Sequence, residues 1–152
     1  MVWTTGVSGD ARFIDSTARE SIRELSRAYS LDDGRLRVQG ALVEQYAECS
    51  HRGWDGYGAE PVRQDTFRNA YRFIEALPHG FPMPTVGAEA DGHLTLEWYR
   101  NPSRVVSVSV SPESDLHYAA LLGGTARRNG TEPFLGEVPA DLLQIIRRVV
   151  SA

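Results

Sequence analysis

The chain has 152 residues, of which 41% are hydrophobic and 24% are charged, and its formal net charge is −4. This length and composition fit one folded domain with a sizeable core. The acidic balance disfavours a general nucleic-acid-binding protein, which normally carries an excess of basic residues.

Missing residue types exclude several kinds of chemistry. All sixteen Lys and Arg positions are arginine, so neither a lysine Schiff base nor a phosphate-loop lysine is available. Cys49 is the only cysteine, so no intrachain disulfide can form, and we expect its thiol to lie in the core. No apolar run approaches the roughly 18 residues of a membrane span. We therefore expect a cytoplasmic protein with no membrane partner and no cofactor.

The N-terminal residues predict an arm followed by a helix. Residues 1–14 show no clear period, and we expect them to form a flexible arm, with residues 15–152 forming a single domain. Thr17 begins a capping-box spacing, and the apolar residues after it predict a helix that ends near Ser30. Residues 31–34, Leu-Asp-Asp-Gly, predict a turn.

The next segment fits two kinds of secondary structure. Residues 35–39 alternate between polar and apolar, which is typical of a short strand. From Ala41 onward, the spacing of Leu42, Tyr46 and Cys49 predicts a helix. The sequence leaves the start of this segment open between the two.

A clearer helix and a sheet follow. One apolar stripe over residues 67–77 predicts a helix that stops before Pro78. The period then changes from helical to alternating, and turn signals such as Asp91-Gly92 separate the alternating runs. Four strands are predicted near residues 86–88, 94–99, 106–110 and 116–122.

The C-terminal part predicts a loop, a short strand and a helix. Residues 123–130 contain three glycines and two arginines, which is typical of an exposed loop, and residues 134–135 predict a last short strand. Pro139 precedes a broad apolar helical face over residues 142–150. The predicted fold class is α+β, with N-terminal helices, a four- to five-stranded antiparallel β-meander and a C-terminal helix.

The segment Gly53-Trp54-Asp55-Gly56-Tyr57-Gly58-Ala59-Glu60-Pro61 places two aromatic residues and an acid among glycines. Together with the helix after it and the run Leu94-Thr95-Leu96-Glu97-Trp98, it resembles an uncharacterised family of small bacterial proteins with a Trp-Asp-Gly-Tyr-Gly-Ala motif. The resemblance covers roughly the last two thirds of the chain. It implies a bacterial origin and a real structural unit, and it assigns no activity, cofactor or catalytic residue.

Trp54, Asp55 and Tyr57 are the first candidate binding residues. One interpretation is a pocket for a ligand or partner, in which Asp55 accepts hydrogen bonds between aromatic walls. The other is a structural loop, in which both aromatic rings fill the core and Asp55 caps a turn. We favour the structural loop.

His93 and Glu97 are the second candidates, and they lie on the polar face of one predicted strand. Four residues of strand separate them by about 13 Å, which is too far for them to share a metal ion. His117 on a neighbouring strand can approach either of them. Scattered polar residues on a solvated sheet face are far commoner than a metal site, and we predict no metal.

Three functions fit the sequence. We favour a non-enzymatic protein-interaction module of a bacterial accessory system, an antitoxin-like or immunity-like protein that binds a dedicated protein partner or associates with itself. An alternative is a small enzyme with its site at residues 53–61, in which Asp55 acts as acid or base beside His51. A weaker alternative is nucleic-acid binding through arginines of the first helix and of residues 123–130.

Overall fold

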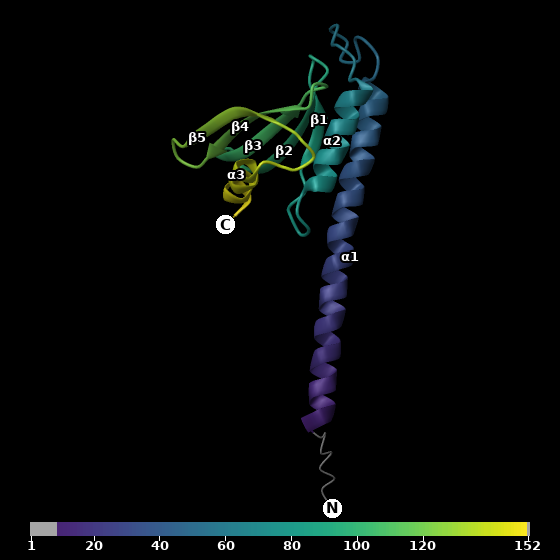
Figure 1. Ribbon diagram of the computed structural model, residues 1–152, viewed down its shortest axis with the longest axis vertical. Helices are drawn as coiled ribbons and strands as arrows, with labels where there is room; N and C mark the ends of the chain where they lie inside the picture. The colour runs from purple at the N-terminus through teal and green to yellow at the C-terminus, as the bar shows by residue number, and fades with distance from the viewer. Residues whose placement is uncertain (1–8, 152) are drawn as a thin grey trace, which may run out of the picture. The chain divides into compact units, whose positions relative to one another are not determined.

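The computed structural model of the 152-residue chain describes the backbone of residues 9–151 and the side chains of residues 19–26 and 33–151. Helices lie at both ends of the described chain, and an antiparallel sheet of five strands lies between them (Figure 1). This confirms the predicted α+β class. The helices are α1 (Gly9–Cys49), α2 (Gln64–Ala76) and α3 (Ala140–Val150). The strands are β1 (Thr85–Ala88), β2 (Leu94–Asn101), β3 (Arg104–Val110), β4 (Asp115–Leu122) and β5 (Arg127–Pro133).

The chain divides into two units, Met1–Asp33 and Gly34–Ala152. In the first unit, residues 9–33 belong to α1, so the part of the predicted arm from residue 9 to 14 is helical. Residues 1–8 of that arm lie outside the described residues. The second unit holds the remainder of α1 and every other described element. None of the described helices is long and apolar enough to cross a membrane.

α1 runs unbroken past the helix end predicted near Ser30 and through the turn predicted at residues 31–34, so both of those predictions are wrong. Residues 35–39, which the sequence left open between strand and helix, are helical. Val38, Leu42 and Cys49 lie at helical spacing and are buried, whereas Leu36 is 61% exposed. An interior glycine such as Gly34 costs a helix about 1 kcal/mol. Burying one large apolar side chain such as Leu42 contributes about 1.5–3 kcal/mol. Packing of this stripe therefore overrides the local turn signal.

α2 confirms the predicted amphipathic helix and ends before Pro78. Its last carbonyl groups have no donors within the helix, as at any helix C-terminus. Arg35 supplies donors from α1: its Nη1 donates to the carbonyl of Glu75 at 2.8 Å and its Nη2 to the carbonyl of Leu77 at 2.9 Å. One guanidinium thus caps α2 and ties it to the second-unit part of α1.

The strands follow one another across the sheet in chain order, and each neighbouring pair is antiparallel. One row across all five strands shows the register, because Val86, Leu96, Val108, Tyr118 and Gly130 are successive partners. Leu96 and Val108 in this row are fully buried. The predicted alternation of β2, β3 and β4 is therefore confirmed.

β5 occupies residues predicted to form a loop, and the short strand predicted at residues 134–135 does not exist; these two predictions are wrong. The connection after β4 is only residues 123–126. β5 carries almost no apolar side chain, and its pairing with β4 comes from the backbone, so no hydrophobic alternation marks it. Phe134, just after β5, is 5% exposed and packs in the core.

α2 and α3 cover the same face of the sheet. Phe73 of α2 packs against Trp98 of β2, with ring centroids 6.4 Å apart, and α3 packs against β2, β3 and β4. Among the described residues no helix packs on the opposite face, which we call the open face. The open face consists of the side chains of His93, Thr95, Glu97, Tyr99, Val105, Ser107, Ser109, His117, Ala119, Leu121, Arg127, Asn129 and Thr131.

Candidate functional site

The segment of residues 53–61 forms a turn organised by Asp55. Its Oδ1 accepts hydrogen bonds from the backbone N–H groups of Tyr57, at 2.8 Å, and Ala59, at 3.0 Å. These donors, Ala59 first and then Tyr57, hold the pKa of Asp55 below its ordinary value. A carboxylate stabilised in this way is a weaker base, so the geometry does not favour proton transfer by Asp55.

The same segment joins the end of α1 to the β1–β2 hairpin. The indole Nε1 of Trp54 donates to the carbonyl of Glu60 at 2.9 Å, and the Glu60 N–H donates to the carbonyl of Ala90 at 2.8 Å. Trp54 also packs against the core. Tyr57 is 95% exposed, so the prediction that its ring fills the core is wrong: the turn points it into solvent. Trp54 and Asp55 therefore have structural roles in this turn, and the Tyr57 ring is an exposed aromatic side chain.

His93 and Glu97 lie on the open face, and His117 of β4 does approach His93. Their imidazole rings stack with centroids 5.8 Å apart and an interplanar angle of 8°. Nδ1 of His93 lies 3.1 Å from the Ser109 Oγ. Within the described part of the chain, no group of three His, Cys, Asp or Glu residues is placed to hold a metal ion.

Hydrogen bonds connect side chains along the open face. Ser107 Oγ donates to Glu97 Oε2 at 3.1 Å, joining β3 to β2. His117 Nδ1 lies 2.9 Å from the Thr131 Oγ1, joining β4 to β5. Glu97, Ser107 and the paired His117 and Thr131 therefore have defined positions without any bound partner.

A shallow hollow of about 350 Å³ lies on this face over β3, β4 and β5. It exists because Ser107 and Ala119 are register partners with small side chains. The larger side chains of Val105, Leu121 and Arg127 surround it. A protruding side chain of another molecule has room to enter here.

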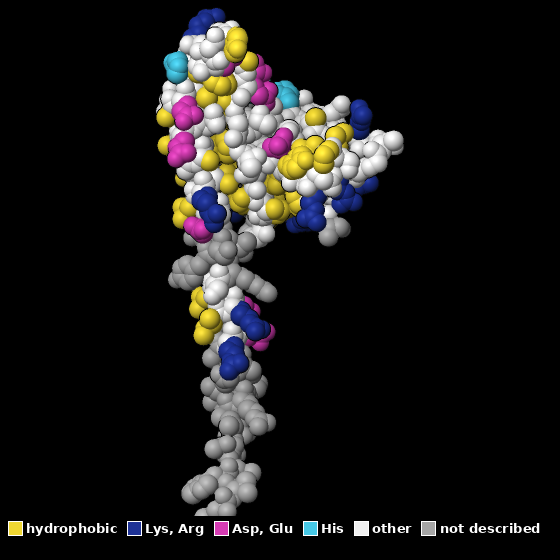
Figure 2. Space-filling model, turned by 180° about the vertical axis from the view of Figure 1, so that it is seen from behind, with side chains coloured by type: hydrophobic (Ala, Val, Ile, Leu, Met, Phe, Trp, Pro, Cys, Tyr) yellow, Lys and Arg dark blue, Asp and Glu magenta, His cyan; other side chains and the backbone are white. Residues whose placement is uncertain are grey.

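Charge is distributed unevenly across the sheet. Glu97 on β2 and Asp91 in the β1–β2 turn place acid at one side, and Arg127 on β5 places base at the other. Figure 2 shows this from behind: acidic side chains lie toward the β1 side of the sheet, and basic ones gather toward β4, β5 and α3. The open face is thus polar, with opposite charges at its two ends.

Several of these residues were not candidates from the sequence, and the arginines of residues 123–130 were candidates only for nucleic-acid binding. Ser109 and Thr131 hold the two histidines, and Arg127 and Asn129 join the site only because residues 127–133 form a strand. No alternating pattern marked that strand, so the sequence carried no signal for it. Because Arg127 and Arg128 are successive strand residues, their side chains leave β5 on opposite faces and do not form one basic patch.

No family model matches this chain, and no match is found among curated proteins or solved structures.

Proposed function

We propose that this protein is a non-enzymatic interaction module and that the open face of the sheet is its binding surface. The observation that supports this most directly is a five-stranded sheet with helices packed on one face only. The open face is more than solvated strand surface, since it has a hollow and ordered polar side chains. Those features suit recognition of another macromolecule.

Pre-formed hydrogen bonds reduce the entropy that binding would otherwise cost. Immobilising one flexible side chain at an interface costs about 0.5–1.5 kcal/mol. Glu97 is already held by Ser107, and His117 by Thr131. Docking therefore orders few additional groups on this side of the interface. Tyr99, 61% exposed at the end of β2, adds an aromatic ring at the rim, and aromatic residues are enriched in interfaces.

The partner that best fits this surface is a basic protein with a convex contact surface, whose basic residues meet the acidic side of the sheet at Glu97 and Asp91. The chain has a net charge of −4, and the carboxylates of Glu97 and Asp91 lie at the acidic side of the sheet. Acidic charge steers a basic partner during encounter and opposes association with acidic ones. An antitoxin-like or immunity-like role, in which one bacterial protein neutralises another, is the setting we propose.

Capture from cells that carry the gene tests this proposal, with the hollow blocked in one variant. Ala119→Arg places a long cationic side chain in the hollow without burying it, since Ala119 is exposed. The matched control is Ala140→Arg, an exposed site at the start of α3 on the covered side of the sheet. Circular dichroism and thermal unfolding establish that both variants fold.

We expect the wild type and Ala140→Arg to retain one stoichiometric basic protein, and Ala119→Arg to lose it. The rate at which this basic protein associates with the wild-type chain should fall as ionic strength rises. Two results would contradict the proposal: a partner retained equally by both variants, or a captured protein with an acidic surface. The molecular mass of the purified chain in solution shows whether it associates with itself. If it does so through the open face, a second copy occupies that face and the basic-partner proposal fails.

A further inference from the structure

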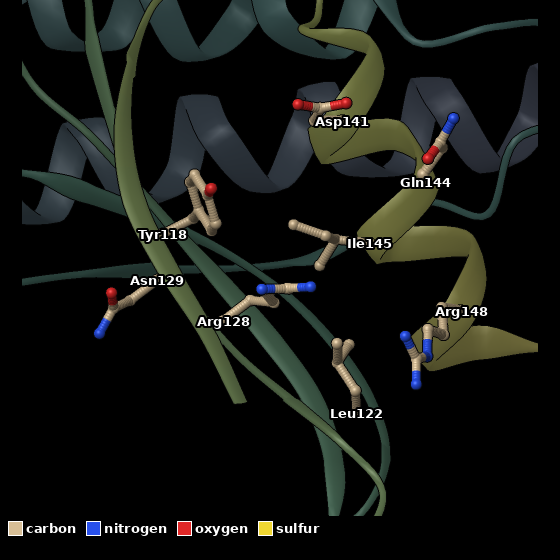
Figure 3. Close-up of a pocket in the computed structure, with 8 residues that line it drawn as sticks. All are labelled: Tyr118, Leu122, Arg128, Asn129, Asp141, Gln144, Ile145 and Arg148. Atoms are coloured by element: carbon tan, nitrogen blue, oxygen red, sulfur yellow. The ribbon is translucent and has the colours of Figure 1, made fainter. Parts of the chain in front are cut away.

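A second concave site lies on the covered side of the sheet, where α3 leaves β5 bare. Its volume is about 460 Å³, within the range of small-molecule sites. α3 packs against β2, β3 and β4 but not against β5, so a gap remains between α3 and the edge strand. The lining residues are Tyr118, Leu122, Arg128, Asn129, Asp141, Gln144, Ile145 and Arg148 (Figure 3).

Tyr118 forms an aromatic wall of this cavity because its β5 partner is a glycine. A Cβ atom at Gly130 would lie 2.7 Å from the Tyr118 Oη and 2.9 Å from its Cζ. Only a residue without a side chain lets the ring lie across β5 in this way. Ile145 of α3 and Leu122 of β4 supply the apolar surface opposite.

Two arginines enter the cavity from different elements. Figure 3 shows Arg128 extending from β5 between Tyr118 and Leu122 toward α3, with Arg148 of α3 on the far side and Asn129 turned away. Among the described residues neither guanidinium has a hydrogen-bond or ion-pair partner. By contrast, the neighbouring Arg147 lies over the Phe81 ring at 5.5 Å and has a packing role.

The other end of the cavity carries different groups. Asp141 and Gln144, on the first turns of α3, line it, and Asp141 likewise has no partner within the described part of the chain. A carboxylate there accepts hydrogen bonds and repels a second anion. The cavity therefore combines a basic end, an aromatic and aliphatic middle, and an acceptor end.

We propose that this cavity binds a small molecule with one anionic group, a carboxylate or a phosphate, and a hydrogen-bond donor at its other end. Arg128 and Arg148 hold the anion, since guanidinium groups match the planar forks of carboxylate and phosphate oxygens. Tyr118 and Ile145 contact the body of the ligand. Asp141 accepts from its amino or hydroxyl group. This site opens on the covered side of the sheet, although it shares Arg128 and Asn129 at the β5 edge with the lining of the open-face hollow. Its argument does not rest on the proposed function.

Nuclear magnetic resonance titration of the full chain tests the proposal with two pairs of probes. Adenosine 5′-monophosphate is compared with adenosine, and glycyl-leucine with glycyl-leucine amide, each up to about 10 mM. We expect saturable shifts of the Tyr118, Arg128 and Arg148 amides with at least one anionic probe, and weaker or no binding of its uncharged counterpart. Binding of the nucleotide alone identifies a phosphate ligand, and binding of the dipeptide alone a carboxylate; either result supports the site.

Arg127 and Arg128 provide a matched pair of variants. Arg128→Gln should raise the dissociation constant of the bound probe about tenfold, as loss of a charge-assisted hydrogen bond predicts. Arg127→Gln removes the same charge one residue away on the opposite face and should change it less than about twofold. Arg148→Gln repeats the test from α3, should Arg128→Gln fail to fold. No saturable binding, equal binding of the uncharged probes, or an equal loss in Arg127→Gln would overturn the proposal.

Discussion

The phenol ring of Tyr118 on β4 lies across Gly130 on β5, so closely that a Cβ atom at residue 130 would be 2.7 Å from its Oη. The two residues are register partners, so the contact is fixed by the sheet itself. The contact places an aromatic ring at the edge of the cavity, where β5 alone offers no apolar side chain.

Gly130→Ala should destabilise the protein by about 1–3 kcal/mol, because the new methyl group forces the Tyr118 ring out of its position. Urea unfolding measures the change, and the Tyr118 ring resonances report its displacement. Gly87→Ala is the control, since Gly87 in β1 has nothing within 4 Å of an added Cβ. It should be neutral or stabilising by up to about 1 kcal/mol. Equal effects of the two changes would refute this account.

Gly40→Ala should stabilise the protein by about 0.5–1 kcal/mol. Gly40 lies in the interior of α1, is exposed, and has nothing within 4 Å of an added Cβ. Alanine restricts the unfolded chain and favours helix. Gly92→Ala should do the opposite, since its φ of +88° disfavours a side chain and the added Cβ would lie 2.7 Å from the Pro61 carbonyl oxygen. Thermal unfolding of both variants checks the two signs together.

Asp55→Asn should lower the free energy of unfolding at pH 7, because a neutral amide accepts more weakly from the Ala59 and Tyr57 N–H groups. The pKa of Asp55 lies below its ordinary value of 3.8, so the ionised form adds stability above that pH. The addition disappears as the pH falls through the lower pKa of the folded state. Chemical denaturation at several pH values should therefore show the wild type and the variant converging in acid.

The control for Asp55 is Asp65→Asn. Within the described part of the chain, the Asp65 carboxylate makes a surface ion pair with Arg68 at 3.3 Å, and such pairs contribute little. We expect a smaller change for this variant at pH 7. A stability difference for Asp55→Asn that stays constant from neutral to acid pH would show that the carboxylate charge does not hold the turn.

Arg35→Ala should cost about 1–2 kcal/mol, because two carbonyls at the end of α2 lose a charged donor. Arg35→Lys should fall in between, since an ammonium group lacks the fork that reaches both oxygens. Leu36→Ala, at the adjacent and 61% exposed position, should change the stability by less than about 0.5 kcal/mol. Denaturant unfolding measures the three stability changes from the shifts in midpoint, provided that the dependence of the free energy of unfolding on denaturant concentration is the same in all variants. A loss in Leu36→Ala as large as that in Arg35→Ala would point to lost side-chain packing along α1 instead of capping, since alanine is the better helix former at both positions.

The sequence predicted those helices and strands that have one buried face and one face exposed to solvent. Val106, Val108 and Val110 alternate with Ser107 and Ser109, and the structure buries all three valines. A one-residue shift would bury the serines, so the pattern determines the register. The same reasoning identified the stripe of α2, because its period of 3.6 residues reflects direct burial.

The parts that it did not predict depend on distant residues. Gly34 is a local turn signal, yet the helix continues through it because Val38 and Leu42 pack on the core. Arg127 and Arg128 carry no strand pattern, because an edge strand is held by the backbone of its neighbour. The candidate site shows the same limit: the shared face of His93 and Glu97 follows from alternation, whereas the cavity requires β5 to be in place.

The order of the strands also bears on how the chain folds during its synthesis. Each strand pairs with the one made immediately before it, so every hairpin can form as soon as its second strand is available. The covered face of the sheet is completed later, because Leu142, Ile146 and Val149 pack on it only after α3, a helix of eleven residues, has been synthesised. Until then the nascent sheet exposes the part of β2, β3 and β4 that α3 covers, and that interval is when it is most prone to aggregate.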